Sequence, residues 1–140
     1  MIILDTNVVS ELMRPNPESK VVDWVAAQAV SNLYLSSVSE AELRYGIEIL
    51  PSGARRDRLH SEVEGMLRED FSGRVLPFDS AATQSYAAIA AARRAAGRPI
   101  NHADCQIAAI ARSRGASVAT RDMGDFQGNG VDVVNPWSTP

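Results

Sequence analysis

Short apolar segments alternate with longer segments of helical character along this chain of 140 residues. The apolar segments lie around residues 3–4 and at 32–38, 74–78, 116–120 and 131–134. Short strands separated by helices are typical of a parallel sheet that is covered on both faces. The pattern therefore predicts one α/β domain over residues 1–140, a three-layer sandwich with four to five parallel strands.

Helical spacing of apolar residues and the placement of Pro and Gly indicate where the helices lie. Pro15 and Pro17 stop a first short helix, and Pro51 and Gly53 stop a later one. Gly115 follows the end of another. The expected helices cover residues 7–13, 19–29, 39–50, 55–70, 79–97 and 101–114.

Composition narrows the class of protein. Apolar residues make up 45% of the chain and charged residues 22%, as in ordinary globular domains. The first residues lack the pattern of a signal peptide, and no apolar stretch reaches the roughly 18 residues of a membrane span. With a single cysteine, Cys105, no internal disulfide can form. We expect a cytoplasmic protein that does not contact membranes.

The charge balance bears on the kind of partner. A net charge of −3 argues against a simple basic nucleic-acid binder. Of the 14 basic residues, however, all but Lys20 are arginine. The planar guanidinium fork matches phosphate oxygens, so this bias is compatible with a phosphate-bearing substrate.

Four acidic residues stand where an open parallel sheet places its ligand. Asp5 follows the first strand, Asp122 follows the strand at 116–120, and Glu42 lies near the start of the helix after residues 32–38. Asp104 lies in the first turn of the helix that begins near residue 101. Ligands of such sheets bind beyond the carboxyl ends of the strands, where the strand order reverses. We expect the four carboxylates to meet at that edge.

Each of these acids also has a structural explanation. Ser39-x-x-Glu42 fits a capping box, and Asn101-x-x-Asp104 resembles one. Asp5 precedes a helix and fits an N-cap, whereas Asp122 fits a turn.

The four together favour a metal site over four separate caps. Crowded carboxylates repel one another, and a bound cation removes that repulsion. Hard oxygen ligands without thiolates select Mg²⁺ or Mn²⁺ rather than zinc. Two such ions would bring the formal charge from −3 to +1, which makes the acidic balance compatible with a nucleic acid.

Four motifs in this order resemble those of a known family. They are "MIILDTNVVSEL" (1–12), "LSSVSEAELRYGIEIL" (35–50), "HADCQIAAIARSRG" (102–115) and "VATRDMGDF" (118–126). Together they resemble a PIN-domain ribonuclease, specifically the VapC-type toxin of a bacterial type II toxin–antitoxin pair. The resemblance implies a PIN-like fold over the single domain 1–140, and an acidic site that holds Mg²⁺ or Mn²⁺.

The resemblance also implies roles for particular residues. The catalytic and metal-binding quartet corresponds to Asp5, Glu42, Asp104 and Asp122. Smaller polar positions that support the quartet correspond to Thr6, Asn7, Thr120 and Asp125. The position of Asp122 is often Asn in related toxins, so its direct or water-mediated contact with metal stays open.

The implied activity is hydrolysis of RNA phosphodiester bonds by a metal-activated water. The implied partners are an RNA substrate and a small cognate antitoxin with a DNA-binding N-terminal part. A homodimer is expected from the resemblance and from helices rich in Ala and Leu.

Three other kinds of protein are alternatives to a PIN-domain ribonuclease. A haloacid-dehalogenase-type phosphohydrolase needs a second Asp two residues after Asp5, where this chain has Asn7. A receiver domain needs adjacent acids after the first strand, and only Asp5 is present. A catalytically silent RNA-binding or scaffold protein on the same fold is the remaining alternative.

Overall fold

A five-stranded parallel sheet forms the centre of the protein in a computed structural model that describes residues 1–138. Its strands are β1 (Ile2–Leu4), β2 (Leu33–Ser36), β3 (Val75–Leu76), β4 (Ser117–Ala119) and β5 (Val133–Val134). They lie in the order β3-β2-β1-β4-β5, and all neighbouring pairs are parallel. The predicted α/β architecture is confirmed, although residues 139–140 of the predicted domain lie outside the described part.

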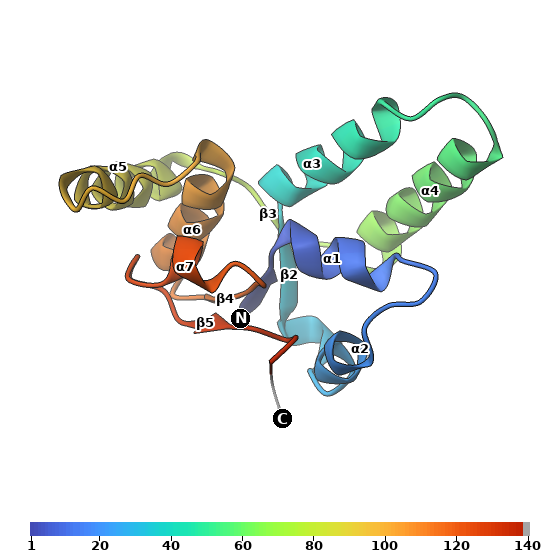
Figure 1. Ribbon diagram of the computed structural model, residues 1–140, viewed down its shortest axis with the longest axis horizontal. Coiled ribbons are helices and arrows are strands. Elements are labelled where there is room, and N and C mark those ends of the chain that lie inside the picture. The colour runs from blue at the N-terminus through green and yellow to red at the C-terminus, as the bar shows by residue number, and fades with distance from the viewer. Residues whose placement is uncertain (139–140) are drawn as a thin grey trace.

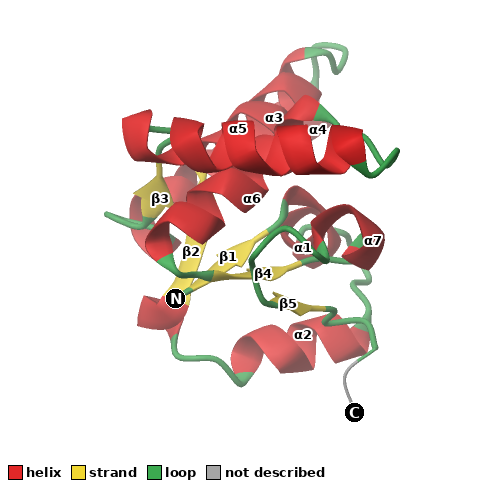
Figure 2. Ribbon diagram, turned by 90° about the vertical axis from the view of Figure 1, so that its left-hand side faces the viewer, coloured by secondary structure: helices red, strands yellow, loops and turns green. Residues whose placement is uncertain are grey.

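Helices cover both faces of the sheet, as predicted. Helices α5 and α6 lie on one side of the strands and α1 and α2 on the other (Figures 1 and 2), while α3 and α4 project beyond the sheet as a pair (Figure 1). The helices are α1 (Thr6–Leu12), α2 (Ser19–Ala26), α3 (Ser37–Glu48), α4 (Ala54–Gly65), α5 (Ser80–Ala95), α6 (His102–Arg114) and α7 (Met123–Phe126). Short helical segments at Val30–Asn32 and Met66–Asp70 complete the elements.

Alternating side chains of the central strands divide the core into two parts. Ile3 and Val118 pack with α5 and α6, whereas their neighbours Leu4 and Ala119 pack with α1 and α2. This alternation is the ordinary consequence of the pleat, which turns successive side chains to opposite faces. Because both faces are buried, the strands contain few polar residues until they end.

One predicted helix boundary was wrong in a way that matters for function. Helix α3 begins at Ser37, and the hydroxyl of Ser36 caps it by accepting the Ser39 amide at 3.0 Å. Glu42 therefore lies beyond the first turn, and the predicted capping box between Ser39 and Glu42 does not form. Ser36 and Ser39 are equally suitable caps by residue type, and the residue at which β2 ends determines which of them caps α3.

Other boundaries moved by a few residues. Helix α2 ends at Ala26, three residues before its predicted end, and β3 keeps only two of its five predicted residues. The short helix α7 was not predicted at all. No helix within residues 1–138 is long and apolar enough to cross a lipid bilayer.

The strand order reverses between β1 and β4, which are direct neighbours. Leu4 pairs with Ala119, and the Asp5 amide donates to the Ala119 carbonyl at 2.9 Å. The first polar residues after the two strands, Asp5 and Thr120, therefore stand side by side at the carboxyl edge. This is the place where open α/β sheets bind their ligands.

Candidate active site

Asp5 is a buried carboxylate held by two donors. Its Oδ1 accepts the Thr6 amide at 2.7 Å, and its Oδ2 accepts the Thr120 hydroxyl at 2.7 Å. The side chain of Asp5 caps α1, so that structural explanation is correct, yet the residue is only 4% exposed. Burial raises the pKa of Asp5, and the charges of Asp122 and Glu42 raise it further, against the effect of the two hydrogen bonds.

Glu42 reaches the same place from α3. Its Oε1 accepts the hydroxyl of Thr6 at 2.8 Å, and that hydroxyl also lies 2.8 Å from the Ser39 Oγ. Since Glu42 caps no helix, its structural explanation is lost. Thr6 instead links Glu42 to the start of α1, directly beside Asp5.

Asp104 occupies the first turn of α6 and combines a structural with an electrostatic role. Asn101 caps the helix by accepting the Asp104 amide at 2.8 Å, and the Asn101 amide group donates to the Asp104 Oδ2 at 2.7 Å. Burial raises the pKa of Asp104 to about 6, with added repulsion from Asp5 and Asp125. A carboxyl group that resists ionisation next to other acids is typical of sites that receive a cation or a proton.

Asp122 is exposed and is tied to the others through Asn7. The Asn7 amide group donates to the Asp122 Oδ2 at 3.2 Å and lies 3.4 Å from the Thr120 Oγ1. The Asp122 amide in turn donates to the Thr120 hydroxyl at 3.0 Å. Thr120 thus connects Asp122 with Asp5, and both Asn7 and Thr120 form hydrogen bonds with acids of the predicted quartet.

These carboxylates line one open pocket of about 490 Å³. Its walls contain all four predicted acids and also residues that the sequence did not indicate. The lining residues are Asp5, Thr6, Asn7, Ser10, Glu11, Arg14, Glu42, Asp104, Arg121, Asp122 and Trp137. Asp125 does not line the pocket, but it raises the pKa of Asp104, which does.

Two arginines stand at this acidic pocket. Arg14 pairs with the buried Glu11 at 3.3 Å, and Glu11 also accepts the Glu18 amide at 3.0 Å. Arg121 lies over the ring of Trp137, 4.8 Å from its centroid. Trp137 comes from the end of the chain, more than a hundred residues from Glu11, so no local pattern could have placed it here.

The donor set suits a hard divalent cation. Carboxylate oxygens are the ligands that Mg²⁺ and Mn²⁺ prefer, and a cation would relieve the repulsion that raises the pKa of Asp5 and Asp104. Among residues 1–138, no three acidic, His or Cys side chains already converge closely enough to form a ready-made metal cluster.

Without a bound metal, the charged form of Asp104 lowers the stability of the folded protein, and a substitution at this position should measure that effect. The pKa of Asp104 is raised above that of an unfolded Asp, so its contribution to stability is present below pH about 4 and is lost as pH rises through about 6. We expect Asp104→Asn to increase the free energy of unfolding by about 1–2 kcal/mol at pH 8, after allowance for partial exposure.

Urea unfolding at pH 8 and pH 4 in EDTA measures this effect. The gain from Asp104→Asn should disappear at pH 4, because the wild-type carboxyl is then protonated as well. The same substitution at an exposed position, Asp23→Asn on α2, is the matched control. An equal effect of Asp104→Asn at both pH values would contradict the raised pKa.

Comparison with known proteins places the chain in a family. The model of the PIN domain matches residues 2–127. "Plasmid stability protein StbB" of Pseudomonas syringae pv. tomato is 50% identical over 98% of this chain and 99% of its own length. "VapC ribonuclease Y4jK" of Sinorhizobium fredii is 45% identical, with 98% of each chain covered. The chain therefore belongs to the PIN-domain family, within its VapC-type toxins.

Solved structures agree with this assignment. The crystal structure of FitAcB from Neisseria gonorrhoeae contains a chain with a TM-score of 0.94 and 42% identity, covering 99% of this chain and 100% of that one. DNA-bound VapBC from Salmonella typhimurium contains a chain with a TM-score of 0.82 and 27% identity, covering 96% and 97%. The family and fold that the four sequence motifs predicted are confirmed.

Proposed function

We propose that this protein is a metal-dependent endoribonuclease and the toxin of a toxin–antitoxin pair, acting in the cytoplasm. The observation that carries the proposal is the pocket at the strand-order reversal, where Asp5 and Asp104 both have a raised pKa. Relatives named as a VapC ribonuclease and a tRNA-specific endonuclease support the choice of RNA as substrate. We infer Mg²⁺ or Mn²⁺ as the cofactor because the donors are carboxylates.

Each acid has its orientation fixed by a neighbour. Thr6 and Thr120 fix Asp5, the amide of Asn101 fixes Asp104, and both are proposed as direct metal ligands. A bound ion would supply a water of lowered pKa for attack on a phosphodiester.

The remaining two acids complete the proposed site. Glu42, held by Thr6, either binds the ion or orients the attacking water. Asp122, held by Asn7, completes the negative charge of the site.

Cleavage of RNA by the purified protein tests the proposal. We expect cleavage of RNA with Mg²⁺ or Mn²⁺, loss of cleavage with EDTA, and recovery when Mn²⁺ is added in excess. A catalytically silent RNA-binding protein on this fold would leave RNA intact and bind Mn²⁺ poorly. Cleavage that persists unchanged in EDTA would overturn the metal-dependent mechanism.

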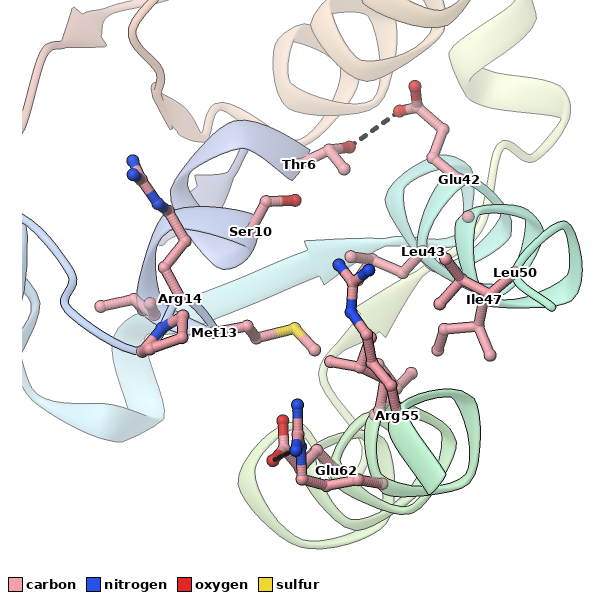
Figure 3. A pocket seen from close by; sticks show the side chains of 16 residues that line it. Thr6, Ser10, Met13, Arg14, Glu42, Leu43, Ile47, Leu50, Arg55 and Glu62 are labelled. Atoms are coloured by element: carbon pink, nitrogen blue, oxygen red, sulfur yellow. Dashed lines mark hydrogen bonds and ion pairs between the residues drawn. The ribbon is translucent and has the colours of Figure 1, made fainter. Parts of the chain in front are cut away.

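The proposed antitoxin has a groove available to it. A groove of about 950 Å³ shares Thr6, Ser10, Arg14 and Glu42 with the acidic pocket. It is also lined by Met13, Ile47 and Leu50 (Figure 3). We infer that a disordered antitoxin tail lays apolar side chains into this groove and extends an Arg or Lys into the acidic pocket. Similar chains occur in solved structures of FitAB bound to a DNA fragment and of DNA-bound VapBC, which supports a partner protein for this chain.

Co-expression with the neighbouring small gene tests the partner. Growth arrest should occur with the toxin alone and should be relieved by the partner, with a stable complex on purification. Replacing the basic residue of the tail with Ala should weaken inhibition of RNA cleavage. A partner that binds while cleavage continues at full rate would refute this model of control.

The homodimer remains a prediction. Tyr45 on α3 and Ile49 at its C-cap are 68% and 64% exposed, which offers an apolar surface to a second copy. Light scattering at micromolar concentration should give twice the mass of one chain. A monomer mass would count against the dimer.

A further inference from the structure

A smaller pocket, which shares no lining residue with the acidic pocket or the groove, is lined by three arginines. It has a volume of about 160 Å³ and lies between the end of α5, α6 and the loop that follows α7. The arginines are Arg93, Arg98 and Arg112, and Asn129 contributes a polar wall. No carboxylate of the described residues lines this pocket, so its positive charge is not balanced locally.

Arg93 is the most deeply placed of the three. It is 9% exposed, and it donates to the Arg98 carbonyl at 2.6 Å and to the Gly124 carbonyl at 3.3 Å. These acceptors are neutral. Within residues 1–138, neither Arg93 nor Arg98 nor Arg112 pairs with a carboxylate, although six other ion pairs form. A buried guanidinium without an anion is costly, which points to a missing counter-charge.

The loop after α7 is shaped to admit the Arg112 side chain. Gly130 has a φ of +79°, and a Cβ at this position would lie 3.2 Å from the Arg112 Nε. Only glycine tolerates both the backbone conformation and the close approach. The same turn buries Asn129, which is 3% exposed.

Asn129 lines the pocket and holds the turn after α7 in place. Its amide nitrogen donates to the Asp125 carbonyl at 2.9 Å, which fixes the orientation of the side chain. Its Oδ1 is buried and has no hydrogen-bond partner among the described residues. This oxygen is closed off from solvent, so a ligand in the pocket would meet the arginines instead.

We propose that this pocket binds one tetrahedral oxyanion of the phosphate class. Guanidinium groups bind phosphate oxygens through paired, charge-assisted hydrogen bonds. The pocket is smaller than the roughly 300–1,000 Å³ of sites for drug-sized ligands, which suits a group of the size of a phosphoryl.

The proposed anion site is connected to the acidic pocket through one peptide segment. Arg93 at 3.5 Å and Asn129 at 2.9 Å both donate to the Asp125 carbonyl, and the Asp125 side chain acts on Asp104. An anion that fixes Arg93 therefore also fixes the backbone that carries Asp125. The anion site does not depend on the proposed nuclease activity, because its residues lie outside the acidic pocket.

Titration with inorganic phosphate in EDTA tests the site without metal and without cleavage. We expect saturable binding by calorimetry, and shifts of the Arg side-chain Nε–H signals by NMR, at constant ionic strength set with chloride. Arg98→Ala and Arg112→Ala should each weaken binding about tenfold or more. Arg94→Ala on α5 removes the same charge outside the pocket and should change the dissociation constant by less than about twofold.

Binding of two RNAs that differ only at the 5′ end distinguishes an RNA end from free phosphate as the ligand. Tighter binding of a short RNA with a 5′-phosphate than with a 5′-hydroxyl, lost in Arg112→Ala, supports the site with an RNA end as ligand. Equal binding of the two RNAs, with phosphate binding still lost in Arg112→Ala, supports the site with the free ion as ligand. Absence of phosphate binding at millimolar concentration, or equal binding by wild type, Arg98→Ala and Arg112→Ala, overturns it.

Discussion

Asp5→Asn is expected to lower the rate of RNA cleavage by about a thousandfold or more. A metal ion contributes several kcal/mol to stabilising the transition state, and each 1.4 kcal/mol corresponds to about tenfold in rate. Asp5 is the most buried of the four acids and the one that both Thr6 and Thr120 orient. An amide keeps the shape of the side chain and loses the charge that holds the cation.

The fold should survive this substitution. One hydrogen bond at Asp5 is lost, but a buried charge with a raised pKa is removed, so the free energy of unfolding should change by less than about 1 kcal/mol. Asp23→Asn on the surface of α2 is the matched control and should retain full activity. Comparable cleavage by Asp5→Asn and wild type would remove Asp5 from the proposed mechanism.

Phe126→Ala is expected to lower the free energy of unfolding by about 3–5 kcal/mol, because it leaves a cavity in the core. Phe126 is fully buried and packs with Ile107, Ile110 and Val118 in the core beneath α6. It anchors α7, the helix that starts after Asp122. Chemical denaturation of the purified protein measures the effect.

Gln127→Ala is the control for Phe126→Ala. Gln127 is the next residue and is exposed, so its truncation should cost no more than about 0.5 kcal/mol. Where Phe126→Ala remains folded, RNA cleavage should also fall, because α7 no longer holds Asp122 against Asn7. A stability loss below about 1 kcal/mol would show that Phe126 is not a core anchor.

Much of the site could be predicted because several of its side chains directly follow strands, and the strands can be recognised in the sequence. Asp5 follows β1 directly and Thr120 follows β4 directly, so predicting the two strands also placed the two side chains. The carboxyl ends of parallel strands share one edge, which brought Asp122 to the same place. Asp104 followed from Asn101, which is an unambiguous helix cap.

What the sequence missed depends on contacts between distant segments. Trp137 reaches the pocket because the end of the chain folds back past β4, and no periodicity indicates this. Helix α7 has four residues, too few to display helical periodicity. The start of α3 was predicted wrongly because both Ser36 and Ser39 are suitable helix caps. The choice between them depends on the residue at which β2 ends.

Direct measurement of Mn²⁺ binding tests the central claim, that these carboxylates form a divalent-cation site. Titration calorimetry of the wild-type protein near pH 7.5 should show saturable Mn²⁺ binding that weakens as pH falls below about 6, where Asp104 takes up a proton. Asp5→Asn should lose the binding, while Asp23→Asn should keep it. Absence of Mn²⁺ binding by the wild type, or equal binding by Asp5→Asn, would contradict the account.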